Sequence, residues 1–171
     1  MLTKQQIQDL FKQLNAALRA RGEIGEVGIV GGAVMCLVYN ARQSTKDIDA
    51  IFEPAALIRE LCKKIARDQS LPVDWLNDAA KGFLRPGFER EEVLSLSNLR
   101  VWAPDARYML AMKCVSARWD THDRDDVIFL IKLLEYTKAE QVFDLISEYY
   151  PKGQIEAKTQ FFIEEVFEEH I

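Results

Sequence analysis

Two acidic residues stand one residue apart in the segment Asp47-Ile48-Asp49, which continues into an alternation typical of a strand. In an extended chain alternate residues face opposite sides, so Asp47 and Asp49 share one face while Ile48 points to the other. Two carboxylates held this close repel each other unless a cation lies between them. A Mg²⁺ ion prefers oxygen ligands and would relieve the repulsion. The alternative is a solvent-facing strand that carries two ordinary surface aspartates.

A glycine pair, Gly31-Gly32, separates an apolar run at residues 27–30 from an apolar stretch at residues 33–39. The run suits a buried strand and the stretch suits a helix. Glycine lets a backbone come close to a ligand, and the start of a helix offers unpaired N–H groups and a positive dipole end to an anion. The alternative is a tight strand-to-helix turn that requires a positive φ angle.

The two motifs together predict a phosphate-binding turn next to a metal site. Phosphoryl or nucleotidyl transfer requires this combination, because oriented N–H donors bind the phosphates while metal ions stabilise the attacking and leaving oxygens. Neither motif alone predicts this chemistry.

The order of the motifs resembles that of the DNA polymerase beta-like nucleotidyltransferase superfamily, in which a Gly-Gly or Gly-Ser pair precedes a helix and an Asp-x-Asp strand. Within this superfamily the chain is similar to the bacterial AbiEii-like branch of toxin–antitoxin nucleotidyltransferases and its uncharacterised relatives. The matching segments fall between residues 27 and 134, at 31–33, 44–49, 110–118, 123 and 126–127. The N-terminal and C-terminal helices lie outside the resemblance.

The resemblance implies a role for each matching residue in the first half of the chain. Asp47 and Asp49 would hold catalytic Mg²⁺ or Mn²⁺ ions. The glycine pair and Lys46 would bind the nucleoside triphosphate substrate. Superfamily members with a complete site use a third strand carboxylate as general base or metal ligand, and Asp74 is the candidate by order and local pattern. The alternative for Asp74 is a loop-capping aspartate.

A second group of candidates lies in the C-terminal half. Lys113 interrupts an apolar helical segment, where a buried ammonium needs a phosphate or carboxylate partner. Alternatively its stem covers apolar surface and its head reaches water. The resemblance implies a catalytic role for Lys113 and nucleotide binding by Arg118, Asp123 and Asp126. The last three residues fit equally well a salt-bridged helix start with Asp123 as N-cap.

Two features depart from the family pattern. Gly32 stands where many active members have serine, which removes one side-chain donor to the phosphates. The 171 residues show no obvious acceptor-binding domain and no basic arm for tRNA. Both features favour an enzyme that has lost activity and only binds nucleotide, or binds none.

The pattern around these residues predicts an α+β or mixed α/β fold, two classes that the sequence alone does not separate, in which a small mixed sheet of nucleotidyltransferase type is flanked by helices. The sheet belongs to a core at residues 1–104, and residues 105–171 form a helical bundle packed on it. Thr3 and Gln6 form a predicted capping box before the first helix. Strands are predicted at residues 27–30, 47–52, 71–75, 93–96 and 99–102. The C-terminal helices are predicted at residues 108–119, 123–134, 138–149 and 154–170.

The composition is that of a globular protein with 49% hydrophobic and 29% charged residues. A formal net charge of −5 argues against a protein that coats nucleic acid. No apolar run approaches the roughly 20 residues that span a bilayer, and the N-terminus lacks a signal pattern, so a cytoplasmic protein without membrane association is predicted. Three separated cysteines are expected to be small buried residues rather than disulfide partners or zinc ligands.

The leading hypothesis is therefore a Mg²⁺-dependent enzyme that moves a nucleoside monophosphate from a nucleoside triphosphate to a hydroxyl of RNA, such as tRNA, or of protein. The resemblance implies a toxin–antitoxin or phage-defence setting with a cognate partner protein. One alternative is an inactive nucleotidyltransferase-fold protein that binds or regulates, as an antitoxin does. Another is an antibiotic-type adenylyltransferase with a small-molecule acceptor. The sequence predicts neither the nucleotide nor the oligomeric state.

Overall fold

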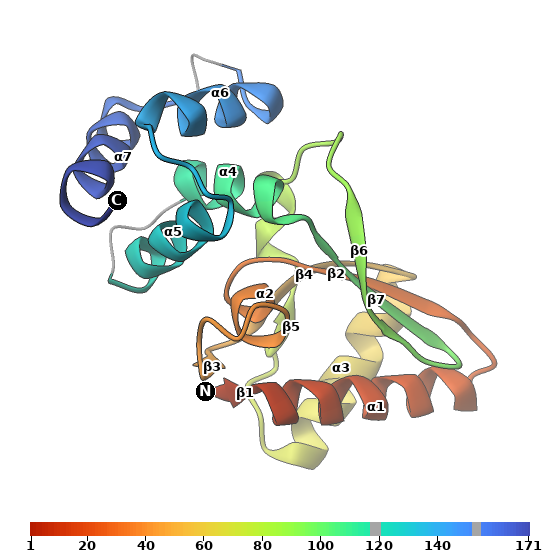
Figure 1. The fold of residues 1–171 in the computed structure, drawn as a ribbon. Coiled ribbons are helices and arrows are strands. Elements are labelled where there is room, and N and C mark those ends of the chain that lie inside the picture. Colours follow the sequence, from red (N-terminus) through yellow and green to blue (C-terminus); the bar gives the residue numbers. More distant parts are fainter. Residues whose placement is uncertain (117–120, 152–154) are drawn as a thin grey trace. The chain divides into compact units, whose positions relative to one another are not determined.

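A computed structural model describes residues 1–116, 121–151 and 155–171 (Figure 1). Contacts divide these residues into two compact units. The first unit comprises residues 1–82 and 90–104, and the second comprises residues 83–89 and 105–171. Residues 83–89 lie within the core predicted at residues 1–104, and by their contacts they group with the helices of the second unit.

A mixed five-stranded sheet forms the centre of the first unit, with the strand order β5-β4-β2-β7-β6. In the middle of the sheet β2 runs antiparallel to β4 and parallel to β7. At the edges β5 is parallel to β4, and β6 is antiparallel to β7. The strands are β2 (Gly25–Ile29), β4 (Ile48–Glu53), β5 (Leu76–Asn77), β6 (Arg90–Ser95) and β7 (Leu99–Pro104).

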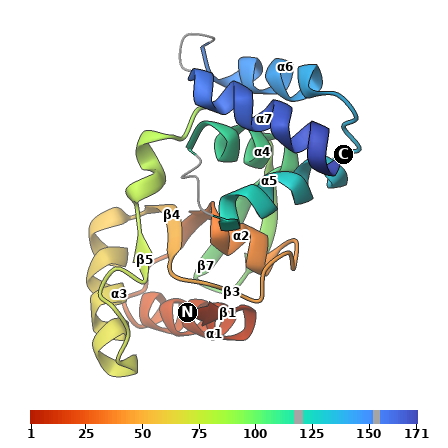
Figure 2. The same ribbon diagram turned by 90° about the vertical axis from the view of Figure 1, so that its left-hand side faces the viewer.

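Helices α1 (Lys4–Ala20) and α3 (Ala55–Gln69) pack against each other, and they contact β7 and β4 respectively. They cover one face of the sheet (Figures 1 and 2). Helix α1 begins with the predicted capping box, because the Thr3 side chain accepts from the backbone N–H of Gln6 while the Gln6 side chain accepts from that of Thr3. Its apolar stripe is buried at Ile7, Leu10, Phe11, Leu14 and Leu18.

The remaining elements of the first unit are short. A two-stranded antiparallel sheet pairs β1 with β3, and helix α2 contacts both β3 and β4. A 3₁₀ helix, η1, follows β5 and contacts β4. Their bounds are β1 (Leu2–Thr3), α2 (Gly32–Leu37), β3 (Ser44–Thr45) and η1 (Ala79–Gly82).

Strand β4 shows the predicted alternation. Ile48, Ala50 and Phe52 are buried, whereas Asp49 and Ile51 are partly exposed. Because the buried residues fix the register of the strand, Asp49 is directed to the opposite face of the sheet.

The strand predicted at residues 71–75 is wrong. These residues form a loop and a turn, and the strand begins only at Leu76. Pro72 has no N–H for a ladder, and its carbonyl oxygen instead accepts a hydrogen bond from Trp75 N at 3.1 Å, which closes the turn. The buried Trp75 indole donates to the carbonyl oxygen of Cys62 at 3.1 Å and anchors the turn to α3.

Helices α4 (Ala106–Ser116), α5 (Thr121–Leu133), α6 (Ala139–Tyr149) and α7 (Ala157–His170) make up most of the second unit. Helix α4 contacts each of the other three, and its residues from Tyr108 to Cys114 are buried. A helical bundle was predicted here. The predicted helix end at residue 119 lies outside the described residues.

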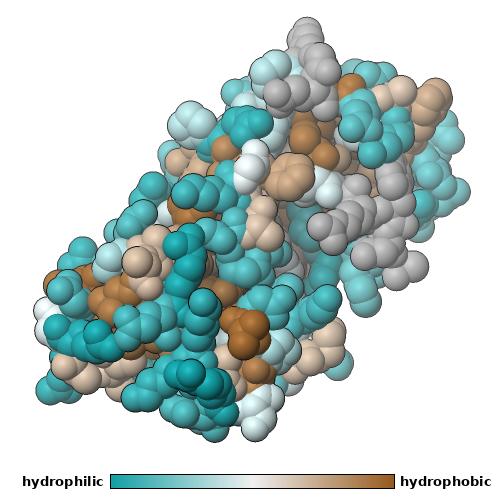
Figure 3. Space-filling view, turned by 180° about the vertical axis from the view of Figure 1, so that it is seen from behind, coloured by the Kyte–Doolittle hydropathy of each residue, from teal (hydrophilic) through white to brown (hydrophobic). Residues whose placement is uncertain are grey.

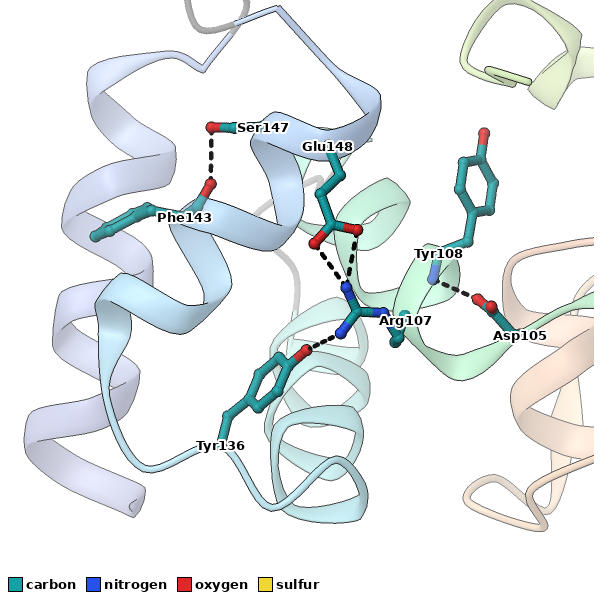
Figure 4. Close-up of polar contacts among 7 residues, drawn as sticks. All are labelled: Asp105, Arg107, Tyr108, Tyr136, Phe143, Ser147 and Glu148. Atoms are coloured by element: carbon teal, nitrogen blue, oxygen red, sulfur yellow. Dashed lines mark hydrogen bonds and ion pairs between the residues drawn. The ribbon is translucent and has the colours of Figure 1, made fainter. Parts of the chain in front are cut away.

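Side chains at the ends of these helices hold the second unit together. Arg107 donates to both carboxylate oxygens of Glu148, at 2.7 and 2.8 Å, and to the hydroxyl oxygen of Tyr136 at 2.9 Å (Figure 4). The bond to Glu148 raises the pKa of Arg107. These contacts join α4 to α6 and to the residues that follow α5.

Two tyrosines attach residues 83–89 to the helices. The Tyr108 hydroxyl oxygen accepts from Arg85 N at 2.6 Å, and the Tyr150 hydroxyl donates to the carbonyl oxygen of Phe83 at 2.8 Å. Burial raises the pKa of Tyr150, and the Arg85 guanidinium lies 5.5 Å from the centre of its ring. These tyrosines explain why the segment belongs to the helical unit.

The mixed sheet and its helices form an α+β fold, which confirms the predicted class. All three cysteines are buried and free, as expected. Among the described residues, none of the helices has the length and apolar character required to cross a membrane. On the face shown in Figure 3, hydrophobic side chains form small separate groups among hydrophilic ones.

Candidate functional site

The glycine pair lies against the second carboxylate of the Asp-x-Asp motif. Just beyond β2, Val30 N donates to the carbonyl oxygen of Asp49 at 2.9 Å, which extends the pairing with β4. Gly31 then adopts a φ angle of +65°, a conformation that favours glycine. A Cβ atom added to Gly31 would stand 3.3 Å from Asp49 Oδ2. The turn and the carboxylate are therefore direct neighbours.

Gly32 connects the turn to the other aspartate through Thr45. A Cβ atom at Gly32 would stand 2.6 Å from Thr45 Oγ1, so only glycine admits the hydroxyl at its present position. Thr45 is buried, and its hydroxyl donates to the carbonyl oxygen of Asp47 at 3.2 Å. The Thr45 hydroxyl thus occupies the space beside Gly32 that a side chain would fill.

Both aspartates of the motif are half-buried. Asp47 immediately precedes β4 and Asp49 is its second residue, with the buried Ile48 between them. Two carboxylates fit Mg²⁺, which binds through one or two carboxylates and completes its coordination with water and phosphate oxygens. Metal binding by Asp47 and Asp49 stays a prediction.

The segment between α2 and β4, residues 38–47, adds positive charge to the site. Arg42 Nη1 would stand 3.3 Å from a Cβ atom at Gly32, and Lys46 is exposed beside the Asp-x-Asp motif. Helix α2 has only six residues. Arg42 could not be identified from the sequence, because nothing in the polar stretch distinguishes it from a surface arginine.

Asp74 lies apart from the strand on which it was predicted. It is exposed in the turn before β5, and the residue paired in register with Asp49 is Asn77. The Asn77 side chain donates to the carbonyl oxygen of Asp74 at 3.4 Å and accepts from Ala79 N at 3.0 Å. The catalytic and metal-binding roles of Asp74 stay predictions.

In the described part of the chain, no three His, Cys, Asp or Glu side chains are grouped so that they could hold a metal ion. Asp47, Asp49 and Asp74 consequently do not form a three-carboxylate set in this structure. A metal ion at this site would depend on the two aspartates of β4 together with oxygens of the substrate.

The second group of candidates forms a buried ionic cluster between α4 and α5. Lys113 Nζ lies 2.6 Å from Asp123 Oδ1 and 2.8 Å from Asp126 Oδ2. Lys113 is 7% exposed and Asp126 is 2% exposed. The buried ammonium is therefore paired with two carboxylates.

The position of Asp123 differs from the predicted helix cap. Helix α5 begins at Thr121, so Asp123 lies within its first turn rather than at the N-cap. Arg118, the fourth candidate of this group, lies outside the described residues. Catalysis by Lys113 and nucleotide binding by Arg118, Asp123 and Asp126 stay predictions.

Comparison of the chain with known families identifies the family to which it belongs. A family model described as "Nucleotidyltransferase of unknown function (DUF6036)" matches residues 5–163. Because this match covers most of the chain, the protein belongs to that nucleotidyltransferase family. The match includes α1 from its second residue and half of α7, which the sequence resemblance had excluded.

The searches of curated proteins and of solved structures found no match. The family description does not name the AbiEii-like branch, so membership of that branch stays a hypothesis.

Proposed function

We propose that this protein is a Mg²⁺-dependent nucleotidyltransferase that moves a nucleoside monophosphate from a nucleoside triphosphate to a hydroxyl group of RNA or protein. The close approach of Gly31 to the Asp49 carboxylate supports the proposal, because it brings the glycine turn next to a side chain that would bind the metal ion. Membership of a nucleotidyltransferase family supports the same reaction class.

In the proposed reaction, the acceptor hydroxyl oxygen forms a bond to the α-phosphorus of the triphosphate. The bond from the α-phosphorus to the oxygen that bridges to the β-phosphate breaks, and its electron pair leaves with pyrophosphate. The hydroxyl proton passes to water. When bound, Mg²⁺ or Mn²⁺ would stabilise negative charge on the attacking and leaving oxygens.

The residues of the chain have distinct tasks in this proposal. Asp47 and Asp49 hold the cation through their carboxylates. The glycine turn would bind the phosphates, and Lys46 would contribute positive charge next to them. Thr45 fixes the backbone of Asp47 through its buried hydroxyl.

The acceptor and the biological setting follow from the resemblance to AbiEii-like enzymes. We propose a hydroxyl of tRNA or of a protein as the acceptor, within a toxin–antitoxin or phage-defence system that supplies a cognate partner. A net charge of −5 favours an acceptor presented locally, such as an RNA end or a protein side chain, over a long stretch of RNA.

A second candidate function is nucleotide binding without catalysis. The exposed position of Asp74, and Asn77 in register with Asp49 on the neighbouring strand, favour it. A site without its third carboxylate could retain the triphosphate and the metal ion but lack a general base. Such a protein would act as a binding or regulatory partner.

One experiment separates the two functions. The purified protein is incubated with each labelled nucleoside triphosphate and Mg²⁺, with bulk tRNA, total lysate protein or no acceptor. Asp49→Asn is the test variant, and Asp68→Asn, an exposed aspartate of α3, is the matched control.

Labelled acceptor that disappears with Asp49→Asn and persists with Asp68→Asn would support the enzyme. Mg²⁺-dependent binding of triphosphate without transfer would support the regulatory protein. Absence of both binding and transfer in the unmodified protein would exclude both functions.

A further inference from the structure

Strand β1 supports the segment that leads into the Asp-x-Asp motif. It pairs antiparallel with β3, so that Leu2 lies opposite Thr45 and Thr3 lies opposite Ser44 (Figures 1 and 2). Among the strands that the structure describes, β3 pairs with β1 and does not join the five-stranded sheet. The position of β3, which ends two residues before Asp47, therefore depends on β1 and on the contacts of β3 with α2.

Strand β1 is itself fixed by burial and by helix α1. The Leu2 side chain is 4% exposed. Thr3 is the N-cap of α1, and its side chain accepts from the backbone N–H of Gln6. Lys4, the first residue of the helix, donates through Nζ to Asn40 Oδ1 at 2.8 Å. Because a buried apolar side chain and a helix cap each resist displacement, β1 is a fixed support for β3.

Thr45 connects this support to the motif. Thr45 is 5% exposed, and its hydroxyl donates to the carbonyl oxygen of Asp47 at 3.2 Å. The same hydroxyl occupies the space beside Gly32, where an added Cβ atom would stand 2.6 Å from it. One strand pair and one hydrogen bond thus join Leu2 to the backbone of Asp47.

We propose that Leu2 is a positioning residue for the metal site. Its burial fixes β1, and through β3 and Thr45 it keeps Asp47 where the carboxylate can bind a metal ion together with Asp49. The inference rests on the proposed function, because it requires a metal ion at the two aspartates. Groups that orient metal ligands from outside the coordination shell change metal affinity by about tenfold to a hundredfold when they are replaced.

Neither the family match nor the sequence motifs assign a role to this strand. The family model matches from residue 5, and β1 comprises Leu2–Thr3. A smaller side chain at position 2 would leave a cavity beside β1 and weaken its pairing with β3. Asp47 would then spend less time in the position that binds the ion.

The test measures equilibrium binding of each nucleoside triphosphate in the presence of Mn²⁺ by calorimetry. Leu2→Ala is the test variant, and Leu2→Met, which nearly conserves the side-chain volume, is the rescue variant. Leu18→Ala is the matched control, because Leu18 is also a buried leucine of the first unit. Leu18 lies beside Gly25 at the start of β2, whereas the glycine turn follows the end of that strand.

Leu2→Ala is expected to weaken binding of Mn²⁺ and triphosphate by about tenfold to a hundredfold. It should also speed the exchange of the amide hydrogens of residues 44–49, which mass spectrometry measures without any metal ion. Leu2→Met should restore both properties. Leu18→Ala should lower the stability to urea but leave binding and this local exchange unchanged. Urea denaturation checks that each variant is folded, and Leu2→Val decides the question if Leu2→Ala is not.

Asp49→Asn separates a failure of this inference from a failure of the proposed function. If the unmodified protein binds Mn²⁺ and triphosphate through Asp49 and Leu2→Ala binds them equally well, the role of Leu2 is excluded while the proposed function stands. Equal weakening by Leu2→Ala and Leu18→Ala would also exclude it, because the loss of stability would explain both. If the unmodified protein binds no triphosphate with Mn²⁺, the proposed function fails and the inference fails with it.

Discussion

Gly32 and Thr45 lie so close that a Cβ atom on the glycine would stand 2.6 Å from the threonine Oγ1. Thr45 is buried, and its hydroxyl also bonds to the backbone of Asp47. Thr45 therefore links the glycine turn to the backbone of Asp47. The turn also lies directly beside Asp49, through Gly31.

Replacement of Gly32 by alanine tests this relationship. The new methyl group must displace the Thr45 hydroxyl, which should lower the free energy of unfolding by about 1–3 kcal/mol and weaken triphosphate binding. Urea denaturation and calorimetry measure the two effects. Gly82→Ala is the control, because a Cβ atom there meets no atom within 4 Å. Equal behaviour of the two variants would refute the proposed contact.

A second glycine tests the sheet rather than the site. A Cβ atom at Gly28 would stand 2.1 Å from Trp102 Cζ2. The indole cannot move easily, since its Nε1 donates to Glu26 Oε1 at 2.8 Å and Arg90 lies 4.2 Å from the centre of the ring. We expect Gly28→Ala to cost about 1–3 kcal/mol of stability, or more, in urea denaturation. A stability unchanged from that of the unmodified protein would contradict the described packing.

The buried cluster of Lys113, Asp123 and Asp126 predicts a large stability effect. Lys113→Met removes a cation that is bonded to both carboxylates, and breaking a buried ion pair costs about 3–5 kcal/mol. The triple variant Lys113→Met/Asp123→Asn/Asp126→Asn should recover part of this loss, because it also removes the two charges that lose their Lys113 partner. Denaturation of both variants measures the difference.

The same variants test the predicted catalytic role of Lys113. If the triple variant is folded and still transfers nucleotide, the cluster is structural. If the triple variant is folded but inactive, and Asp68→Asn remains active, the result supports the catalytic role of Lys113 that the family resemblance implies.

Two buried thiols predict a loss of stability in alkali. Burial raises the pKa of both Cys62 and Cys114 from 9.0 to about 12. Below pH 9 the thiols stay protonated in both the folded and the unfolded protein, so they do not change the free energy of unfolding. Between pH 9 and about 12 only the unfolded thiols ionise, so each thiol lowers the free energy of unfolding by about 1.4 kcal/mol per pH unit.

Urea denaturation at a series of pH values from 8 to 11 measures this slope. The variant Cys114→Ala should show a slope smaller by the contribution of one thiol. A slope identical to that of the unmodified protein would show that Cys114 is not protected in the folded state.

The elements predicted well from the sequence are those in which a local pattern decides the structure. Thr3 and Gln6 form their capping box within one helical turn. The alternation of buried and partly exposed residues that starts at Ile48 is likewise a local pattern, and it forms β4. The glycine pair and the Asp-x-Asp motif could be found for a similar reason, because their residue types are unusual for the elements that carry them.

Features that depend on distant contacts could not be predicted in this way. Residues 83–89 belong to the helical unit because Tyr108 and Tyr150 bond to their backbone. Strand β5 begins at Leu76 rather than at residue 71, because the preceding residues form the turn closed by the hydrogen bond between Pro72 and Trp75. Arg42 becomes a candidate only when the structure puts its guanidinium beside Gly32.

Nucleotidyl transfer is tested by two labels in parallel reactions, one with the α-phosphate and one with the γ-phosphate of the triphosphate labelled. We expect the α-label to appear on the acceptor and the γ-label in pyrophosphate, and we expect Asp49→Asn to abolish both. Transfer of the γ-label to the acceptor, or α-label transfer that survives Asp49→Asn, would contradict this expectation.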